Sequence, residues 1–289
     1  MKMFGIKTLI SGMVVALSLS ATAHSQERVA SLGGDLTEII YALGEGDRIV
    51  ATDSTSVFPP AAMLTPKVGY VRQLSAEGVL SVEPDMILIS GAAGPDTALD
   101  QIRATGVPVE IMETAYTVDA IIAKTRRVSD VLGVEDAGEV LVGEIEADWA
   151  AAQAEVAKLG VEPTILFFSN TAEGTPTAAG DQTAAQGVIN MLGGINVFGE
   201  RIGYKPISLE AAVAADPDII LVMNFVAARI GGMKEVTNHP AISLTSAAQN
   251  DRIFMVDAVT VMQFSPRTPG AVGELAAEIA EKIGSPHGE

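Results

Sequence analysis

The sequence has no cysteine, three histidines and an aromatic content of 4%. Without cysteine there is no disulfide framework and no thiol to carry a lipid anchor. The shortage of histidine argues against a zinc or manganese site, because such sites need several imidazole and carboxylate ligands. The chain also lacks the G-x-G-x-x-G turn of dinucleotide-binding enzymes and the G-x-S-x-G elbow of hydrolases. These absences favour a protein that is not an enzyme.

Positive charge is scarce as well. Lysine and arginine number 18 against 36 acidic residues, which gives a net charge of −18 and a pI near 4.5. No run of basic residues interrupts this acidity, so the electrostatic surface that nucleic acid requires is missing. With 289 residues, 48% of them hydrophobic, the chain is long enough to form two domains with aliphatic cores.

The N-terminus has the pattern of a secretory signal peptide. Lys2 and Lys7 precede an apolar run over 8–20, and small residues follow, with cleavage expected after Ala23 or Ser25. The run is shorter than the ~20 residues of a membrane-spanning helix. We therefore expect residues 1–25 to be removed and the mature protein to be soluble in a bacterial periplasm, without a lipid anchor.

Short β-branched runs alternate with helical patterns along the mature chain, which predicts parallel β-α-β units. The expected strands are 28–32, 48–53, 85–90, 107–112, 164–169, 218–223 and 252–257. The helix after the first strand has Asp35 and Glu38 at the spacing of a capping box and Gly44 as its stop.

Residues 135–159 have a different composition, rich in alanine and glutamate and free of proline, which predicts one long helix. The fold class we expect is α/β, with two Rossmann-like lobes, each around a central parallel sheet. The N-terminal lobe would span 26–133, the linking helix 134–160 and the C-terminal lobe 161–289.

A partial repeat supports two similar lobes. The stretch "VGYVRQLSAEGVLSVEPDMILIS" at 68–90 is echoed by "IGYKPISLEAAVAADPDIILVM" at 202–223. In each copy a serine, Ser75 or Ser208, should cap a helix, and Pro-Asp should turn the chain into a buried strand. Helix capping accounts for most of the repeat. It does not account for the Gly-Tyr pair in front of both helices.

Five segments together resemble the periplasmic haem-binding proteins that supply haem ABC transporters. They are "SLGGDLTEIIYALGEGDRIVATDSTSVFPP", "VGYVRQLSAEGVL", "AAGDQTAAQGVINMLGGINVF", "GYKPISLEAAVAADPDIIL" and "FSPRTPGAV". The resemblance implies a helical-backbone substrate-binding protein that captures haem (hemin) between its lobes and delivers it to an inner-membrane permease dimer. An outer-membrane haem receptor would act upstream. A cobalamin or ferric-siderophore receptor of the same class is the alternative.

The resemblance makes Tyr70, in the Gly-Tyr motif of the first lobe, the expected axial ligand of the haem iron. A tyrosine phenolate suits ferric iron. Arg72 is a nearby cation that would favour the phenolate. Without the resemblance, Tyr70 would be interpreted as a loop aromatic and Arg72 as a solvated charge.

Some relatives supply a histidine as second ligand from the opposite lobe, but the corresponding loop at 169–183 contains none. The iron would then have five ligands, or another group of the second lobe would complete its coordination. Asn170 and Met262 are candidates, although a turn residue and a core filler are their simpler interpretations. Tyr204 is a stronger cleft candidate, whereas His239 more simply caps a turn.

Lys205 and Arg229 are candidates for pairing with the haem propionates, since basic side chains bind carboxylates. Glu77 and Glu210 are the expected permease-docking residues. The resemblance places one such acid on the outer rim of each lobe, and a symmetric permease needs equivalent groups on both. Their alternative role is to stabilise the dipoles of the helices on which they lie.

Overall fold

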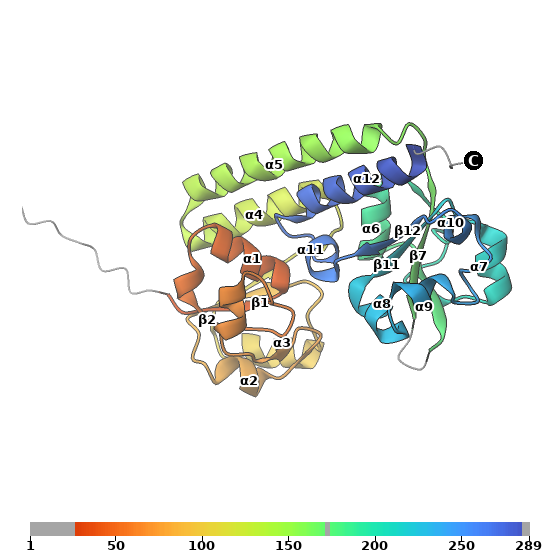
Figure 1. Cartoon of the computed structure of the whole chain (residues 1–289). Helices are drawn as coiled ribbons and strands as arrows, with labels where there is room; N and C mark the ends of the chain where they lie inside the picture. Colours follow the sequence, from red (N-terminus) through yellow and green to blue (C-terminus); the bar gives the residue numbers. More distant parts are fainter. Residues whose placement is uncertain (1–26, 171–173, 285–289) are drawn as a thin grey trace, which may run out of the picture.

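The computed structural model describes residues 27–170 and 174–284. The expected signal peptide therefore lies outside the described residues. Figure 1 shows two α/β lobes side by side, with the long helix α5 (Glu135–Ala157) running along the top of both. This is the α/β architecture expected from the sequence, with a single helix linking two sheets.

The sheet of the N-terminal lobe is entirely parallel and has the order β2-β1-β5-β6. Its strands are β1 (Val29–Leu32), β2 (Ile49–Thr52), β5 (Met86–Ser90) and β6 (Val109–Met112). A short antiparallel hairpin, β3 (Gly69–Tyr70) with β4 (Gln73–Leu74), lies beside this sheet. In parallel sheets the carboxyl ends of the strands share one edge, and ligands usually bind there.

The sheet of the C-terminal lobe has the order β10-β8-β7-β11-β12, and β9 pairs with β7. Its strands are β7 (Thr164–Asn170), β8 (Pro176–Ala179), β9 (Ile195–Asn196), β10 (Tyr204–Pro206), β11 (Ile219–Met223) and β12 (Ile253–Val256). Strands β7, β11 and β12 are parallel, whereas β8 and β10 are antiparallel additions. All five residues of β11 are buried, as expected for a central parallel strand.

Helices cover both sheets. In the N-terminal lobe they are α1 (Gly34–Ala42), α2 (Ala76–Leu80), α3 (Asp96–Arg103) and α4 (Val118–Leu132), with short 3-10 turns η1 (Gly46–Arg48) and η2 (Pro60–Leu64). In the C-terminal lobe they are α6 (Ala184–Met191), α7 (Leu209–Ala215), α8 (Asn224–Ile230), α9 (Met233–Thr237), α10 (Ser246–Gln249), α11 (Ala258–Met262) and α12 (Thr268–Gly284).

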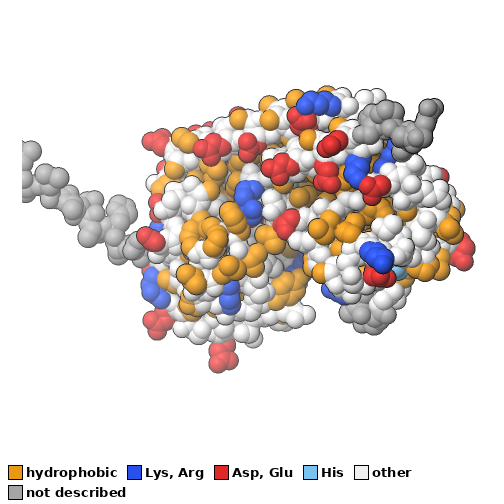
Figure 2. All heavy atoms as spheres, in the orientation of Figure 1, with side chains coloured by type: hydrophobic (Ala, Val, Ile, Leu, Met, Phe, Trp, Pro, Cys, Tyr) orange, Lys and Arg blue, Asp and Glu red, His pale blue; other side chains and the backbone are white. Residues whose placement is uncertain are grey.

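Close packing attaches α5 to one helix from each lobe. A Cβ on Gly138 would meet the Ser129 hydroxyl of α4, and one on Gly273 of α12 would lie 3.0–3.1 Å from Ala152. Small residues let helix backbones approach closely. Helix α12 runs alongside α5 in the same direction, from the middle of the molecule toward the C-terminal lobe (Figure 1). The connection between the lobes is therefore a layer of packed helices, and its outer face carries many of the acidic side chains seen in Figure 2.

The start of helix α1 differs from our prediction. The helix begins at Gly34 with Gly33 as its N-cap, and no side chain caps it. Asp35 and Glu38 do not form a capping box. Each instead forms an ion pair with a residue distant in sequence, Asp35 with Lys124 and Glu38 with Arg267. Tertiary ion pairs have replaced the local hydrogen bonds that the spacing predicted.

The repeat has the capping chemistry that we predicted. The side chains of Ser75 and Ser208 accept hydrogen bonds from the third following backbone N–H, at 3.0 and 3.1 Å. The Pro-Asp aspartates perform matching tasks in the two lobes. Asp85 accepts from the backbone N–H of Arg28 at 2.9 Å, and Asp218 from that of Thr164 at 2.8 Å. Each aspartate thus fastens the start of a neighbouring strand.

Candidate functional site

A cleft lies between the lobes, at the edge formed by the carboxyl ends of β1, β5 and β6. It encloses about 700 Å³, open solvent included, and Figure 2 shows the surface hollowed between the lobes. The N-terminal lobe contributes residues just after these strands, among them Gly33, Ser90 and Thr114. The C-terminal side contributes Ala184 and the end of α11. This is the position expected for a ligand in parallel α/β sheets.

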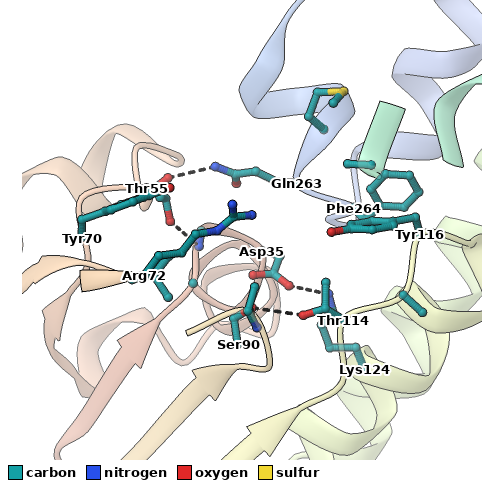
Figure 3. A pocket seen from close by; sticks show the side chains of 17 residues that line it. Asp35, Thr55, Tyr70, Arg72, Ser90, Thr114, Tyr116, Lys124, Gln263 and Phe264 are labelled. Carbon is teal, nitrogen blue, oxygen red and sulfur yellow. Dashed lines mark hydrogen bonds and ion pairs between the residues drawn. The ribbon is translucent and has the colours of Figure 1, made fainter. Parts of the chain in front are cut away.

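The Gly-Tyr motif of the first lobe brings a phenol into the cleft. Gly69 has φ +116°, a conformation that side chains rarely adopt, so glycine is needed in front of Tyr70. Val71 and Leu74 are buried and anchor the hairpin, and the carbonyl of Val71 accepts from the Gly94 N–H at 3.0 Å. Tyr70 and Arg72, which lie on either side of Val71, line the cleft (Figure 3).

The second Gly-Tyr pair follows the same local rule. Gly203 has φ +76°, and Tyr204 on β10 is 42% exposed, against 41% for Tyr70. The Gly-Tyr pairs, which helix capping did not explain, therefore have a role in backbone conformation. A glycine with positive φ presents an accessible tyrosine in each lobe.

Tyr204 lies within electrostatic reach of the cleft residues. Burial, with a smaller contribution from Tyr116, raises the pKa of the Tyr204 phenol to about 12. The positive charge of Arg72 opposes this shift. Since Arg72 lies in the other lobe, its field crosses the cleft. The expected action of Arg72 on Tyr70 stays a prediction.

A buried ion pair forms the floor of the cleft. Lys124 on α4 donates to Asp35 at the start of α1, and their side chains are 5% and 13% exposed (Figure 3). Burying two charges is tolerated because each neutralises the other. The pair fixes α1 against α4, and both side chains line the cleft.

The Asp-Ser-Thr-Ser stretch that contributed to the family resemblance is structural. Asp53 is fully buried and accepts hydrogen bonds from the Gly33 N–H, the Thr55 N–H and the Ser56 hydroxyl, at 3.0, 2.9 and 3.0 Å. It holds the segment after β2 against the N-terminus of α1. Thr55 thereby becomes part of the cleft wall.

The lobes meet at the base of the cleft. Gln263 donates from Nε2 to the backbone carbonyl of Thr55 at 2.9 Å. The rings of Tyr116, from the N-terminal lobe, and Phe264 have centroids 5.2 Å apart (Figure 3). Sequence reasoning missed Tyr116, Gln263 and Phe264. The one signal available for Tyr116 was its position after the strand of residues 107–112.

The remaining predicted residues lie elsewhere. Lys205 is exposed on β10, and Arg229 on α8 stacks over Phe225 at 5.7 Å, outside the lining of this cleft. Of the two minor ligand candidates, Met262 lines the cleft, while Asn170 ends β7. His239 accepts from the Ala241 N–H through Nδ1, as predicted for a turn residue.

The predicted docking acids lie on matching helices. Glu77 in α2 and Glu210 in α7 are both exposed in first turns, outside the cleft lining. Hydrogen bonds from its own backbone N–H and from the Ser208 hydroxyl lower the pKa of the Glu210 carboxyl. Both groups are therefore accessible to a partner.

No cluster of three or more histidine, cysteine, aspartate or glutamate side chains able to hold a metal ion occurs in residues 27–170 and 174–284. Over the same residues, every helix is too short or too polar to cross a membrane. A two-lobed α/β fold with a cleft at the strand ends defines a ligand-binding protein. Comparison with known proteins identifies its family.

The chain belongs to the periplasmic binding protein family, because residues 29–260 match the sequence pattern of that family. This is a family of transport proteins that bind substrates for ABC transporters, not of enzymes. The fold is similar to that of the periplasmic heme-binding protein RhuT from Roseiflexus sp. RS-1 in apo form, with a TM-score of 0.84 and 36% identity. The match covers 89% of this chain and 99% of that one.

Two further comparisons point to different ligands. The heme-binding protein BhuT, in complex with two hemes, has a TM-score of 0.84 and 37% identity, over 89% of this chain and 99% of its own. A vitamin B12-binding protein from Vibrio cholerae serotype O1 is 26% identical over 273 residues, 93% of this chain and 96% of its own. The family and fold are therefore shared by binders of haem and of vitamin B12.

Proposed function

We propose that this protein captures ferric haem in the cleft and delivers it to an inner-membrane ABC permease. The observation that carries the proposal is the β3–β4 hairpin, which presents Tyr70 and Arg72 side by side on the cleft wall. A phenolate is a good ligand for ferric iron. The solved structures that share 36% and 37% identity with the chain are heme-binding proteins, which supports the same ligand.

The iron would be held by Tyr70 rather than by Tyr204. A phenol with a pKa near 12 is harder to ionise than a free phenol, whose pKa is ~10, so burial disfavours the phenolate of Tyr204. Protonated, Tyr204 would serve as a hydrogen-bond donor or as a stacking surface near Arg72 and Tyr116. The absence of histidine in 169–183 fits a five-coordinate iron.

Arg72 is suited to a haem propionate. Among the described residues, its guanidinium takes part in no hydrogen bond or ion pair, and it is exposed to the cleft. A guanidinium binds a carboxylate through two parallel hydrogen bonds. On the other lobe, exposed Lys205 is the candidate for the second propionate. Arg229, which stacks on Phe225, is a second candidate.

Cobalamin is the second candidate, because the curated relative with 26% identity is a vitamin B12-binding protein. Its cobalt, held in a corrin ring that carries neutral amides, has less need of a tyrosinate ligand and of cations. The paired Tyr70 and Arg72 therefore favour haem. A ferric siderophore, the other alternative within the class, has no observation of its own in the cleft.

Delivery would require docking to the permease. We assign this role to Glu77 and Glu210, because the repeat places one exposed acid in the first turn of an equivalent helix in each lobe. Basic groups at equivalent positions of a two-fold symmetric permease could meet both acids at once.

Titration with hemin and with cyanocobalamin tests the ligand. The purified apoprotein should bind hemin with a Soret band and a resonance Raman signal of iron-bound tyrosinate. Excess cyanocobalamin should not displace it. Tight binding of cyanocobalamin without binding of hemin would overturn haem in favour of the second candidate.

A further inference from the structure

We propose that the ion pair between Glu38 and Arg267 is a second joint between the lobes, and that it positions the C-terminal wall of the cleft opposite Tyr70. Glu38 belongs to α1 of the N-terminal lobe, and Arg267 lies between α11 and α12. Only the ligand-affinity part of the proposal rests on the proposed function. The joint itself is a property of the unliganded protein.

The geometry of the pair is that of a strong, two-point contact. Arg267 donates from Nε to one carboxylate oxygen of Glu38 at 2.6 Å and from a terminal nitrogen to the other at 2.9 Å. The Glu38 side chain is 3% exposed and that of Arg267 is 32% exposed. Separating the lobes here would leave a buried carboxylate without its counter-charge, which is strongly unfavourable.

A second segment of the N-terminal lobe holds the same guanidinium. The Cζ atom of Arg267 lies 3.5 Å from the centroid of the Phe58 ring, a close cation–π contact. Phe58 lies in the loop after β2, so Arg267 contacts both α1, through Glu38, and this loop. A guanidinium fixed on its edge and on its face has little freedom to turn.

From Arg267 a chain of hydrogen bonds leads into the C-terminal wall. A terminal nitrogen of Arg267 donates to the Thr260 hydroxyl at 3.2 Å. The N–H and hydroxyl of Thr260 donate to one oxygen of Asp257 at 2.8 and 2.9 Å. Asn224 donates to the other oxygen at 2.7 Å. Asn224 is the first residue of α8, which Figure 1 shows on the side of the C-terminal lobe nearest its neighbour.

The series of hydrogen bonds that starts at Arg267 ends next to side chains suited to contact a ligand. Phe225 is 46% exposed in the first turn of α8, directly after the carboxyl end of β11, and Arg229 stacks on its ring. The joint thus connects Glu38 in one lobe to an aromatic and cationic surface on the other. It complements the contact between Gln263 and Thr55, so that two separate attachments restrict rotation of the lobes.

Distance measurements on the apoprotein test the joint without any ligand. The chain has no cysteine, so Leu64→Cys and Leu244→Cys, at positions 88% and 66% exposed, give one spin-label site in each lobe. We expect a narrow inter-lobe distance distribution in the labelled parent. Glu38→Gln, which removes the charge but keeps the size, should broaden or shift it.

A matched control separates the joint from general loss of an ion pair. Glu27→Gln removes the ion pair between Glu27 and Arg48, which lies within the N-terminal lobe. The Arg48 side chain is 13% exposed, so this pair is also partly buried. This variant should keep the parent distribution. Arg267→Lys retains the charge opposite Glu38 but loses the two-point contact, so it tests the joint if Glu38→Gln does not fold. An unchanged distribution in whichever of these joint variants folds would overturn the proposal.

Hemin titration of the same variants tests the positioning role. If the competent arrangement becomes a minority state, apparent affinity falls by the same fraction, about tenfold for a 10% population. The tyrosinate signal should remain in the bound fraction, since Tyr70 is untouched. A changed distance with parent-like hemin affinity would refute the positioning role. A parent protein that fails to bind hemin refutes the proposed ligand instead, leaving the distance result valid.

Discussion

Gln263 donates a hydrogen bond of 2.9 Å to the backbone carbonyl of Thr55, 208 residues earlier in the chain, and closes the base of the cleft. Gly34 makes this approach possible. A Cβ at Gly34 would lie 2.5 Å from the Gln263 side chain and 2.6 Å from the Thr55 carbonyl oxygen. The contact between the lobes therefore depends on a glycine in the first turn of α1.

Gly34→Ala should destabilise the protein, because the methyl group must displace both neighbours. Overpacking of this kind costs about 1–3 kcal/mol in the free energy of unfolding, measurable by urea denaturation. Gly34→Ala combined with Gln263→Ala should recover only part of the loss, since the Thr55 carbonyl remains. Gly143→Ala is the control. It lies in α5 with nothing within 4 Å of the new Cβ, and should be neutral or stabilising. Equal stability of the Gly34 and Gly143 variants would contradict this packing argument.

Tyr70→Phe should keep the fold but remove the tyrosinate-to-iron signal. Hemin affinity should fall by more than about tenfold, because losing even an outer partner of a metal site costs ~10–100-fold. Arg72→Ala should lower hemin affinity less, through a propionate contact. Tyr41→Phe, in α1, is the matched control and should leave the spectrum unchanged. An unaltered Soret band and affinity in Tyr70→Phe would remove Tyr70 from the site.

The Tyr204 phenol should titrate near pH 12 in the folded protein. Because its folded pKa exceeds the unfolded value of ~10, its contribution to stability is complete below pH ~10 and is lost as pH rises through about 12. The difference between the ultraviolet titrations of the parent and Tyr204→Phe isolates this group. Arg72→Ala should raise the midpoint further, since the Arg72 charge lowers it. A midpoint at or below ~10 would show that burial does not govern this phenol.

Glu77→Ala and Glu210→Ala should impair transfer to the permease while leaving hemin affinity unchanged. Each acid is exposed and outside the cleft lining. The double variant should transport more slowly than either single one in vesicles that contain the permease and ATP. Added salt should mimic the loss, because exposed pairs are screened over about 8 Å at physiological ionic strength.

Glu144→Ala with Glu146→Ala is the control for net charge, since both acids are exposed on α5. It should transport at the parent rate. If the Glu77 and Glu210 double variant also does so, the two acids serve as first-turn charges of their helices and not as docking residues.

Much of the fold follows from local patterns. Alternating strands and helices predicted the parallel sheet of the N-terminal lobe and the parallel strands β7, β11 and β12 of the other lobe, but not the antiparallel strands β8 and β10. A proline-free, alanine-rich run predicted α5. The serines of the repeat act as predicted, because capping involves groups a few residues apart. The aspartates of the repeat instead accept hydrogen bonds from backbone N–H groups 57 and 54 residues away. Of the residues expected at the site, Tyr70, Arg72 and Met262 line the cleft, and their roles there stay predictions.

The sequence by itself determined the strands of the parallel β-α-β units, the long helix α5 and the serine caps of the repeat, because these choices depend on backbone energetics within a few residues. It did not predict the short strands β8, β9 and β10, which depend on pairing with β7 and with one another. Tertiary structure decided the partners of Asp35 and Glu38. Their spacing favoured a capping box, yet they pair with Lys124 and Arg267, 89 and 229 residues away. A buried carboxylate requires a nearby cation, and which cation is near depends on how the lobes pack. The same reason explains why the sequence did not predict Tyr116, Gln263 and Phe264 as site residues. No local pattern distinguishes them, and they line the cleft only because the two lobes pack together there.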